Sequence, residues 1–535
     1  MLQKRTIFMI NWVALLVFFT FFVAVTVLGF LAARWHKGDL NELNEWGLAG
    51  RRFGTVVTWF LLGGDLYTAY TFIAVPAAMF GIGALNGFFA VPYTTLVYPL
   101  IYVLMPRFWS VCKEHGYVTA ADFVQGRFGS KTLALAVAFT GILATMPYIA
   151  LQMFGIEISL AALGIPLTIS LGGFPVDIPL IIAFVILAAY TYTSGLRAPA
   201  MIALVKDVMI FVVLFVTIIY LPMKYGGLGN IFAVVHAKAL ANPGKFFDLL
   251  TPKQFPAYVT LAVGSALALF LYPHALTGVL SSSSQRVVKR NAALLPIYSL
   301  MLGFLALLGY IAIAARVTPL QGFNNNGAIP ALINEAFPSW FAGFAFAAIS
   351  IGALVPAAVM SIAASNLFTR NIYKAYINPD ATGIQESRIA KLISLIVKFG
   401  ALIFIAYLPT QYVLNFQLLG GIWIIQTLPA VFLGLYTRWF NRWALLVGWL
   451  AGMVVGTWMF IAANLSVLYT VKLGGFSLPP MYAAFTTIVL NLVLATISTP
   501  LFEVIGARRG TDETSSSAYE GEIVQESEHG VEALR

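Results

Sequence analysis

TVVTWFLLGGDLYTAYTFIAVPAAMF, residues 55–80, is an apolar stretch long enough to span a bilayer, and it carries one acid near its middle. Gly63 and Gly64 precede Asp65 and Pro76 follows it, so the helix is weakened on both sides of the carboxylate. An acid deep in hydrocarbon costs at least roughly 2.5–3.5 kcal/mol, which indicates a partner or a function. The stretch therefore predicts a broken transmembrane helix with an ion site at the break.

The composition excludes a soluble globular protein. Hydrophobic residues make up 60% of the 535 residues, charged residues make up 10%, and the mean hydropathy is +0.88. The single cysteine, Cys112, excludes an internal disulfide framework, and the five histidines show no metal-ligand spacing. Membrane orientation explains the net charge of +10, so we expect no nucleic-acid partner. The sequence shows no catalytic cluster or cofactor motif, so we expect no enzymatic activity, no catalytic residue and no cofactor.

Thirteen apolar segments are predicted to be transmembrane helices. They lie near residues 7–33, 55–80, 84–106, 132–163, 175–195, 200–222, 256–280, 292–315, 337–369, 390–408, 411–436, 442–466 and 478–503. Most of the 31 Lys and Arg residues fall in the loops on one side of these segments. The positive-inside rule then places the N-terminus outside and the C-terminus in the cytoplasm of a cell inner membrane.

A second broken helix is predicted at residues 256–280. Its centre holds Tyr272, Pro273 and His274, and an inverted repeat would place the counterpart of the first broken helix here, five spans later. The alternative is an ordinary proline kink. At about 1.5 Å per residue, Asp65, His274 and Ser361 lie roughly 20, 18 and 14 Å from the nearest cytoplasmic basic residue. We therefore expect these three groups in one layer of the membrane.

Six motifs, in this order, resemble the sodium:solute symporter family. They are GGDLYTAYTFIAVPAAMFGIGA (63–84), GYVTAADFVQGRFGS (116–130), SGLRAPA (194–200), YPHALTGVL (272–280), PAAVMSIAASNLFTRNIYKAYI (356–377) and LGGIWIIQTLPAVFLGLY (419–436). The resemblance implies an all-α membrane protein with the leucine-transporter-type fold, in which two five-helix repeats are inverted. Two segments, GLRAPAMIALVKD and GGIWIIQTLPA, are most similar to the branch of the family that takes up monocarboxylates.

The implied organisation has five parts. These are an extra N-terminal helix with a cytoplasmic loop (1–54), a first repeat (55–222), a second repeat (256–436), two added helices (437–503) and a disordered cytoplasmic tail (504–535). The implied function is uptake of pyruvate, lactate or a similar acid with sodium by alternating access. A sodium- or proton-coupled proline- or alanine-type carrier is the alternative. We expect a monomer or a weak oligomer in the lipid bilayer.

The resemblance also implies a sodium site between the second and ninth spans. Its residues would be Gly63, Asp65, Leu66, Ala358, Ser361 and Ile362. The family usually has a hydroxyl where Ile362 stands, and sodium prefers oxygen ligands. Sodium coupling and proton coupling through Asp65 are therefore both open. Asp207 is a candidate ion relay, and its alternative is a structural pair with Lys206.

A carboxylate substrate needs a positive or donor-rich site, which the N-terminus of the half-helix after Pro273 would provide. The side chains predicted to complete it are Tyr67, Thr68, Thr71, Gln152, Tyr272, His274 and Thr277. Tyr148 is interpreted as a packing or gate residue. Lys398 is expected to reach the membrane interface, Glu157 to be hydrated at a helix end, and Arg127 to pair with Asp122.

Overall fold

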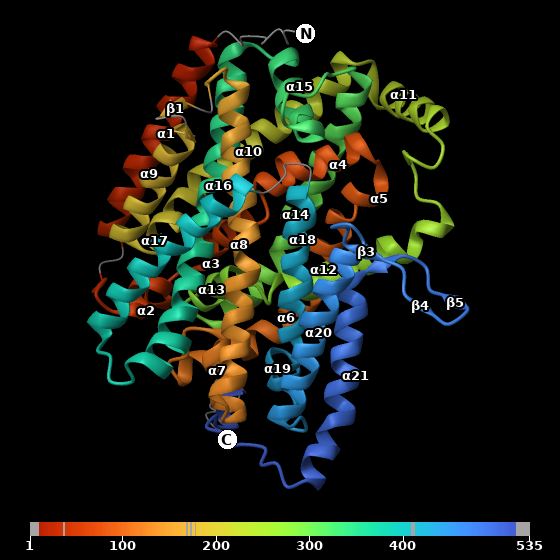
Figure 1. Cartoon of the computed structure of the whole chain (residues 1–535). Coiled ribbons are helices and arrows are strands. Elements are labelled where there is room, and N and C mark those ends of the chain that lie inside the picture. Colours follow the sequence, from red (N-terminus) through yellow and green to blue (C-terminus); the bar gives the residue numbers. More distant parts are fainter. Residues whose placement is uncertain are drawn as a thin grey trace, which may run out of the picture.

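The computed structural model describes residues 10–35, 38–166, 169–171, 174–176, 178–407 and 412–519. Long helices dominate it, and they run between two opposite ends of the molecule (Figure 1). In the first half of the chain the helices are α1 Trp12–Leu31, η1 Ala32–Arg34, α2 Leu43–Leu48, η2 Ala49–Arg51, α3 Thr55–Gly64, η3 Tyr70–Ala74, α4 Val75–Gly81, α5 Ala84–Gly87, α6 Ala90–Glu114, α7 Ala120–Phe128, α8 Lys131–Ala162, α9 Ile178–Ser194, α10 Arg197–Lys224 and α11 Gly227–Ala241.

The second half continues the same architecture. Its helices are η4 Pro252–Gln254, α12 Phe255–Leu269, α13 Pro273–Leu280, α14 Gln285–Ala314, η5 Asn324–Gly327, α15 Ala328–Ala336, α16 Ser339–Phe368, η6 Thr369–Ile377, α17 Gly383–Tyr407, α18 Val413–Ile424, η8 Ile425–Thr427, α19 Leu428–Val431, η9 Leu433–Leu435, α20 Arg442–Ala462, α21 Ala483–Val504 and η10 Ser517–Tyr519. Both broken helices predicted from the sequence are present, as α3–η3–α4 and α12–α13.

Strands are few and short, and all of them pair antiparallel. β1 (Ile169–Leu171) pairs with β2 (Phe174–Val176), with Ser170 opposite Pro175. β3 (Leu468–Tyr469) pairs with β6 (Met481–Tyr482), and between them β4 (Lys472–Leu473) pairs with β5 (Phe476–Ser477). These hairpins join helices, so the fold is helical as predicted.

Within the described residues, nine helices are long and apolar enough to cross a membrane, or ten if the bent pair α12–α13 is one span. Four shorter apolar helices add to them, including Thr55–Gly64 and Tyr70–Gly81, the two pieces of the first broken helix. The number thirteen and the inverted symmetry stay predictions. Part of the first predicted span, 7–33, lies outside the described residues.

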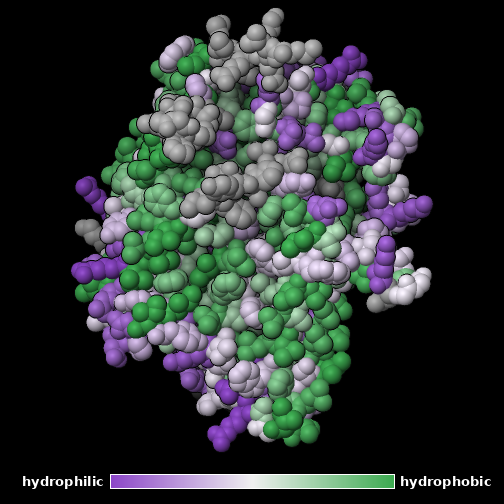
Figure 2. Space-filling model, viewed as in Figure 1, coloured by the Kyte–Doolittle hydropathy of each residue, from purple (hydrophilic) through white to green (hydrophobic). Residues whose placement is uncertain are grey.

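The loops and short helices gather at the two ends of the molecule, and the orientation predicted from the charge bias stays a prediction. α11, α15 and the start of α1 lie at one end, and α7 and the end of α21 lie at the other (Figure 1). Exposed apolar side chains, such as Leu16 of α1 and Leu450 of α20, form hydrophobic flanks between these ends (Figure 2). Such a belt suits a hydrocarbon environment, where backbone polar groups must pair within helices.

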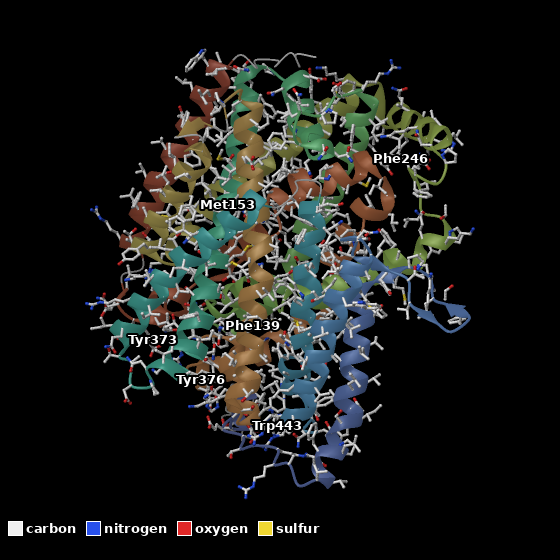
Figure 3. The ribbon with its side chains drawn as sticks, viewed as in Figure 1. Phe139, Met153, Phe246, Tyr373, Tyr376 and Trp443 are labelled. Carbon is white, nitrogen blue, oxygen red and sulfur yellow. The ribbon has the colours of Figure 1, made fainter. Side chains whose placement is uncertain are left out.

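The core lies along α8 and α16. Apolar and small residues fill the α16 sequence, and nearly every residue from Phe341 to Leu367 is buried. Small residues let helix backbones approach closely in a membrane. α8 crosses the whole molecule beside α16, and Phe139 and Met153 mark its two halves (Figure 3). These two helices form the support against which the broken helices are held.

The predicted disordered tail, 504–535, is described only as far as residue 519, and residues 520–535 lie outside the described residues. Residues 505–519 fold back onto α6 and α7. Asp512 pairs with Arg127 at 2.8 Å and with Arg438 at 3.0 Å, and the Tyr519 ring lies 5.0 Å from the guanidinium of Arg107. Charge pairs and cation–π contacts supply the order that the polar composition did not indicate.

The expected pairing of Arg127 with Asp122 is wrong. The two residues are five positions apart on α7, whereas helix neighbours that face each other are three or four apart. Asp122 instead caps the start of α7, where it accepts from Thr119 N at 3.2 Å, and accepts from Asn371 Nδ2 at 2.7 Å.

Candidate functional site

The first break follows the glycine pair. α3 ends at Gly64, residues 65–68 are turns and bends, and the chain resumes as the π-helix η3. The Thr71 hydroxyl donates to Thr68 O at 3.0 Å and accepts from Thr68 N at 3.0 Å, so one side chain replaces the missing helix bonds. The backbone is therefore held open by local side-chain bonds.

The second break lies between α12 and α13, whose axes bend by 48°. Pro273 begins α13, the position where its missing N–H and fixed φ fit a helix. Tyr272 before it is extended, with ψ 135°, as a residue before proline prefers. The N-terminus of α13 therefore lies in the interior of the molecule, where Pro273 and His274 are buried.

The two breaks meet at Asp65 and His274. His274 Nε2 lies 3.3 Å from Asp65 Oδ2, and the imidazole is 1% exposed. Asp65 Oδ1 and His274 Nδ1 are buried and form no hydrogen bond within the described residues. Because buried polar atoms normally have partners, these two atoms mark a place for a ligand, ion or water.

A tyrosine-lined cavity lies next to this contact. It has a volume of about 20 Å³, and its walls are Tyr70, Tyr93, Tyr148, Ser265, Ala268, Leu269, Tyr272, Gln417, Leu418, Gly421 and Tyr482. The Tyr272 and Tyr482 hydroxyls donate to Gln417 O and Leu418 O. Ser265 Oγ and Gln417 Oε1 are buried there without a hydrogen-bond partner among the described residues. A cavity of this size holds a water or a small ion, so a carboxylate would enter only if the lining side chains moved apart.

Four of the predicted substrate residues gather around the two breaks. The Tyr272 ring lies 5.3 Å from the His274 ring, and the Tyr148 ring lies 5.4 Å from it. Gln152 Oε1 accepts from Ala69 N at 3.2 Å, while its buried Nε2 has no hydrogen-bond partner in the described chain. The Thr68 hydroxyl accepts from Tyr70 N at 3.0 Å. These contacts tie Thr68 and Gln152 to the backbone of the first break.

Three of the predicted substrate residues are used elsewhere. The Tyr67 hydroxyl donates to Tyr298 O at 2.6 Å, and its ring packs on the Tyr298 ring. The Thr71 hydroxyl is taken up by Thr68, as described above. Thr277 lines a different cavity of about 20 Å³, between Pro273 and the start of α7. The tyrosine-lined cavity thus contains Tyr272 from the predicted set, together with residues that the sequence did not single out.

The predicted sodium residues on α16 lie on a chain of hydrogen bonds. Ser361 Oγ donates to Ala358 O at 2.8 Å and accepts from Ser394 Oγ at 3.2 Å. Ser394 in turn accepts from Lys398 Nζ at 2.8 Å. Lys398 is 1% exposed, so the expectation that it reaches the membrane interface is wrong: its side chain points from α17 toward α16.

The other predicted sodium residues offer fewer free oxygens. Gly63 O accepts from Leu66 N at 2.9 Å. Ile362 and Leu61 belong to one buried apolar cluster, where the inner half of α3 meets α16. Leu66 is buried. The structure brings the second and ninth spans together, but side-chain carbon fills the Ile362 position.

Lys206 and Asp207 lie beside the first break on α10. Both side chains are fully buried, and Lys206 Nζ is 3.1 Å from Asp207 Oδ1. The Lys206 ammonium also donates to Gly64 O and, at 3.4 Å, to Tyr67 O. These contacts favour the structural interpretation of the Lys206–Asp207 pair, because its lysine binds the opened backbone of the first broken helix.

Helical breaks that face each other in the centre of a membrane-embedded helical bundle define a secondary transporter. The family model of the sodium:solute symporter family matches residues 46–456. The chain is 52% identical over 489 residues to a monocarboxylate transport permease protein of Rhizobium johnstonii, covering 91% of this chain and 96% of that protein. The chain belongs to the sodium:solute symporter family, whose members are membrane transporters and not enzymes.

Other relatives are more distant. An uncharacterised symporter of Bacillus subtilis, YodF, is 34% identical over 92% of this chain and 94% of its own length. The sodium/proline symporter of Escherichia coli is 22% identical over 72% of this chain and 76% of its own. A solved Na+-coupled sialic acid symporter in its substrate-bound outward-open state has a TM-score of 0.71 and 17% identity, and covers 92% of this chain and 98% of its own. That structure shows a shared fold.

Sequence reasoning missed the tyrosines of α6 and the second half. Tyr93, Ser265, Gln417 and Tyr482 come from four separate elements. Tyrosine is enriched at membrane interfaces, so its presence in an apolar run does not by itself indicate a binding site. The available signal was the position of Ser265 in the second predicted broken helix, 256–280, and of Gln417 just before the motif at 419–436.

Proposed function

We propose that this chain imports a short-chain monocarboxylate, such as pyruvate or lactate, by cation-coupled symport through alternating access. The observation that supports this best is the contact between Asp65 and His274, which joins the two breaks next to the tyrosine-lined cavity. The monocarboxylate transport permease of R. johnstonii, 52% identical, supports the substrate class. Hydroxyl donors and the N-terminus of α13 offer the donor-rich surroundings that a carboxylate needs.

Cavities above and below this layer support the alternating-access part of the proposal. An outer cavity of about 300 Å³ is lined by Ala74, Phe89, the Asn324–Asn326 turn, Leu414 and Val467 among others. The cavity at Thr277 lies between Pro273 and the start of α7. The Asp65–His274 contact lies between the two. Rocking of one helix group against the other would open the central site to each cavity in turn.

The architecture proposed for this mechanism has thirteen spans and two inverted five-helix repeats, 55–222 and 256–436. The described order of helices and the two breaks in corresponding positions support it. We place the chain in the cell inner membrane, as a monomer or weak oligomer, with the N-terminus outside and the C-terminus in the cytoplasm. Reaction of an impermeant thiol reagent with single cysteines at Asn242 and Arg509 in intact cells tests the orientation.

Competition for uptake tests the substrate. Radiolabelled pyruvate uptake by cells that produce the protein should be reduced by excess lactate and unaffected by excess proline. A proline- or alanine-type carrier is the second candidate, because a sodium/proline symporter is among the relatives at 22% identity. Inhibition by proline and no effect of lactate would favour that candidate and contradict the monocarboxylate assignment.

A further inference from the structure

The first break already holds a cation, and that cation is a side chain. Lys206 reaches from α10 with its ammonium fully buried and donates to Gly64 O and Tyr67 O. The helix opens between these residues, because Thr68 N donates to the Thr71 hydroxyl instead of continuing the α-helical ladder. Carbonyls freed by a break in a membrane helix are the oxygens that bind a cation in transporters of this architecture.

The backbone is shaped around this ammonium. A Cβ at Gly64 would lie 2.8 Å from Lys206 Nζ and 2.9 Å from Asp207 Oδ2, so a side chain here would displace the ends of both charged side chains. Gly64 therefore lets the lysine and its carboxylate approach the opened chain.

The ammonium faces two carboxylates. Asp207 Oδ1 is 3.1 Å away, and the other titratable groups that face the pair are Asp65, Tyr67 and Tyr298. The neighbouring helices α1 and α16 pack on α10 and contain no charged residue. Lys206 is thus the cation that faces Asp207 at close range. A sodium ion on the same carbonyls would lie against a like charge in surroundings of low dielectric.

We propose that Lys206 is a tethered cation that takes the place of the coupling sodium at this break, so that uptake is independent of sodium and accumulates substrate under a proton gradient. This rests on the proposed symport of a monocarboxylate. It resolves the choice between sodium and proton coupling that the sequence left open. The side chain at position 362 supports this proposal. Ile362 packs in an apolar cluster with Leu61 and offers no oxygen to a sodium ion.

The melting temperature in sodium and in potassium chloride tests, without any substrate, whether Lys206 takes the place of sodium. The melting temperature of the purified wild-type protein in detergent should be the same in sodium and potassium chloride at equal ionic strength. Lys206→Ala removes the ammonium and leaves the carbonyls and Asp207, so we expect sodium to raise its melting temperature by about 2–4 °C over potassium. A sodium-dependent rise in the wild type that Lys206→Ala abolishes would overturn the proposal.

Lys224→Ala is the matched control. Lys224 lies on the same helix and donates to Ala336 O at 2.8 Å, but it lies at the end of α10, away from the break. This variant should behave as the wild type in both salts. Lys206→Gln is the second variant: it keeps donors of similar length without the charge, so it covers the case in which Lys206→Ala does not fold. We expect sodium to stabilise it as well.

Proteoliposomes test the consequence for transport. Wild-type protein should accumulate pyruvate under an inward proton gradient, and replacing sodium with potassium should change the rate less than about two-fold. Lys206→Ala should lose at least about ten-fold of the proton-driven accumulation and gain stimulation by sodium. Wild-type accumulation driven by sodium and not by protons would overturn the proposal.

Counterflow separates the two proposals. Exchange of labelled for unlabelled pyruvate needs no ion gradient, and it reports whether pyruvate is a substrate. Failure of pyruvate exchange, with lactate exchange failing too, would contradict the proposed function, while the melting temperatures would still decide the role of Lys206. Pyruvate exchange together with sodium-driven accumulation would contradict the lysine proposal and leave the substrate assignment standing.

Discussion

The two broken helices differ in the charge that each one presents. The break after α3 turns backbone carbonyls toward the ammonium of Lys206. The break before α13 turns a helix N-terminus and His274 toward the carboxylate of Asp65. Carbonyl ends attract cations and helix N-termini attract anions, so the same kind of irregularity has opposite polarity in the two places.

This difference assigns the two breaks to different parts of the proposed cycle. The cation of the first break comes from a side chain of α10, whereas Asp65 at the second is contributed by the first broken helix itself. A substrate carboxylate near the N-terminus of α13 would compete with Asp65 for His274. We therefore infer that binding of the substrate acts on the contact that joins the two broken helices.

The largest effect should come from Asp65→Asn. The change keeps the shape of the side chain and removes the charge that joins the two breaks, so we expect pyruvate uptake to fall about 100-fold. The measurement is the initial rate of uptake at matched amounts of protein in the membrane. Asp248→Asn is the control, because Asp248 lies 2.7 Å from His236 outside the bundle and that histidine side chain is 61% exposed. Equal losses in both variants would contradict the role of Asp65.

His274→Gln should have the next largest effect. Glutamine can still donate to Asp65 but cannot carry a positive charge, and we expect a loss of about ten-fold, mostly as a higher KM for pyruvate. Kinetics of uptake in proteoliposomes separate KM from the maximal rate. His236→Gln, in the exposed pair, should leave both unchanged. A fall in the maximal rate at unchanged KM would place His274 in the conformational step instead of the substrate site.

Gly64→Ala compares the packing of the first break with an ordinary helix position. Its Cβ would lie 2.8 Å from Lys206 Nζ, and we expect a loss of stability of about 1–3 kcal/mol, as for other overpacked sites. Gly303→Ala on α14 is the control, since the nearest atom to its Cβ is 3.6 Å away. Thermal unfolding in detergent should show a lower melting temperature for the first variant and no decrease for the second. Equal melting temperatures would show that the break has room for a side chain.

Ser361→Ala should have the smallest effect. The hydroxyl joins Ala358 O to the Ser394 and Lys398 chain, and its loss leaves the Lys206 contacts intact. We expect the rate of uptake to change by no more than about two- to three-fold, with the same response to sodium as the wild type. A ten-fold loss confined to sodium-driven uptake would restore a sodium site between the second and ninth spans and contradict the tethered lysine.

The sequence predicted the broken helices well because their signals are local. Gly63, Gly64 and Pro273 each limit the helix within a few residues of themselves, whatever the rest of the chain does. The family resemblance rests on motifs of the same local kind, and the family model that matches 46–456 confirms it. Asp65 and His274 were placed in one layer by counting residues, and the structure adds that they touch.

Partners on other helices could not be predicted in this way. Lys206 and Asp207 are a neighbouring pair on α10, and only the packing of α10 on α3 brings them to Gly64. Lys398 was expected at the interface because its depth in the span is compatible with snorkelling. Its direction depends on which face of α17 meets α16: Ser394 accepts from the Lys398 ammonium, and Ser361 accepts from the Ser394 hydroxyl.

The sequence by itself determined the class of protein, the membrane setting and the positions of both breaks, because hydropathy, glycine and proline act over short distances. The tertiary structure decided what each break contacts: Lys206 at the first, and Asp65 with His274 at the second. The physical reason is that a buried charge is stabilised by whichever partner packing brings within a few ångströms. Helices far apart in the chain, such as α3, α10 and α13, supply those partners.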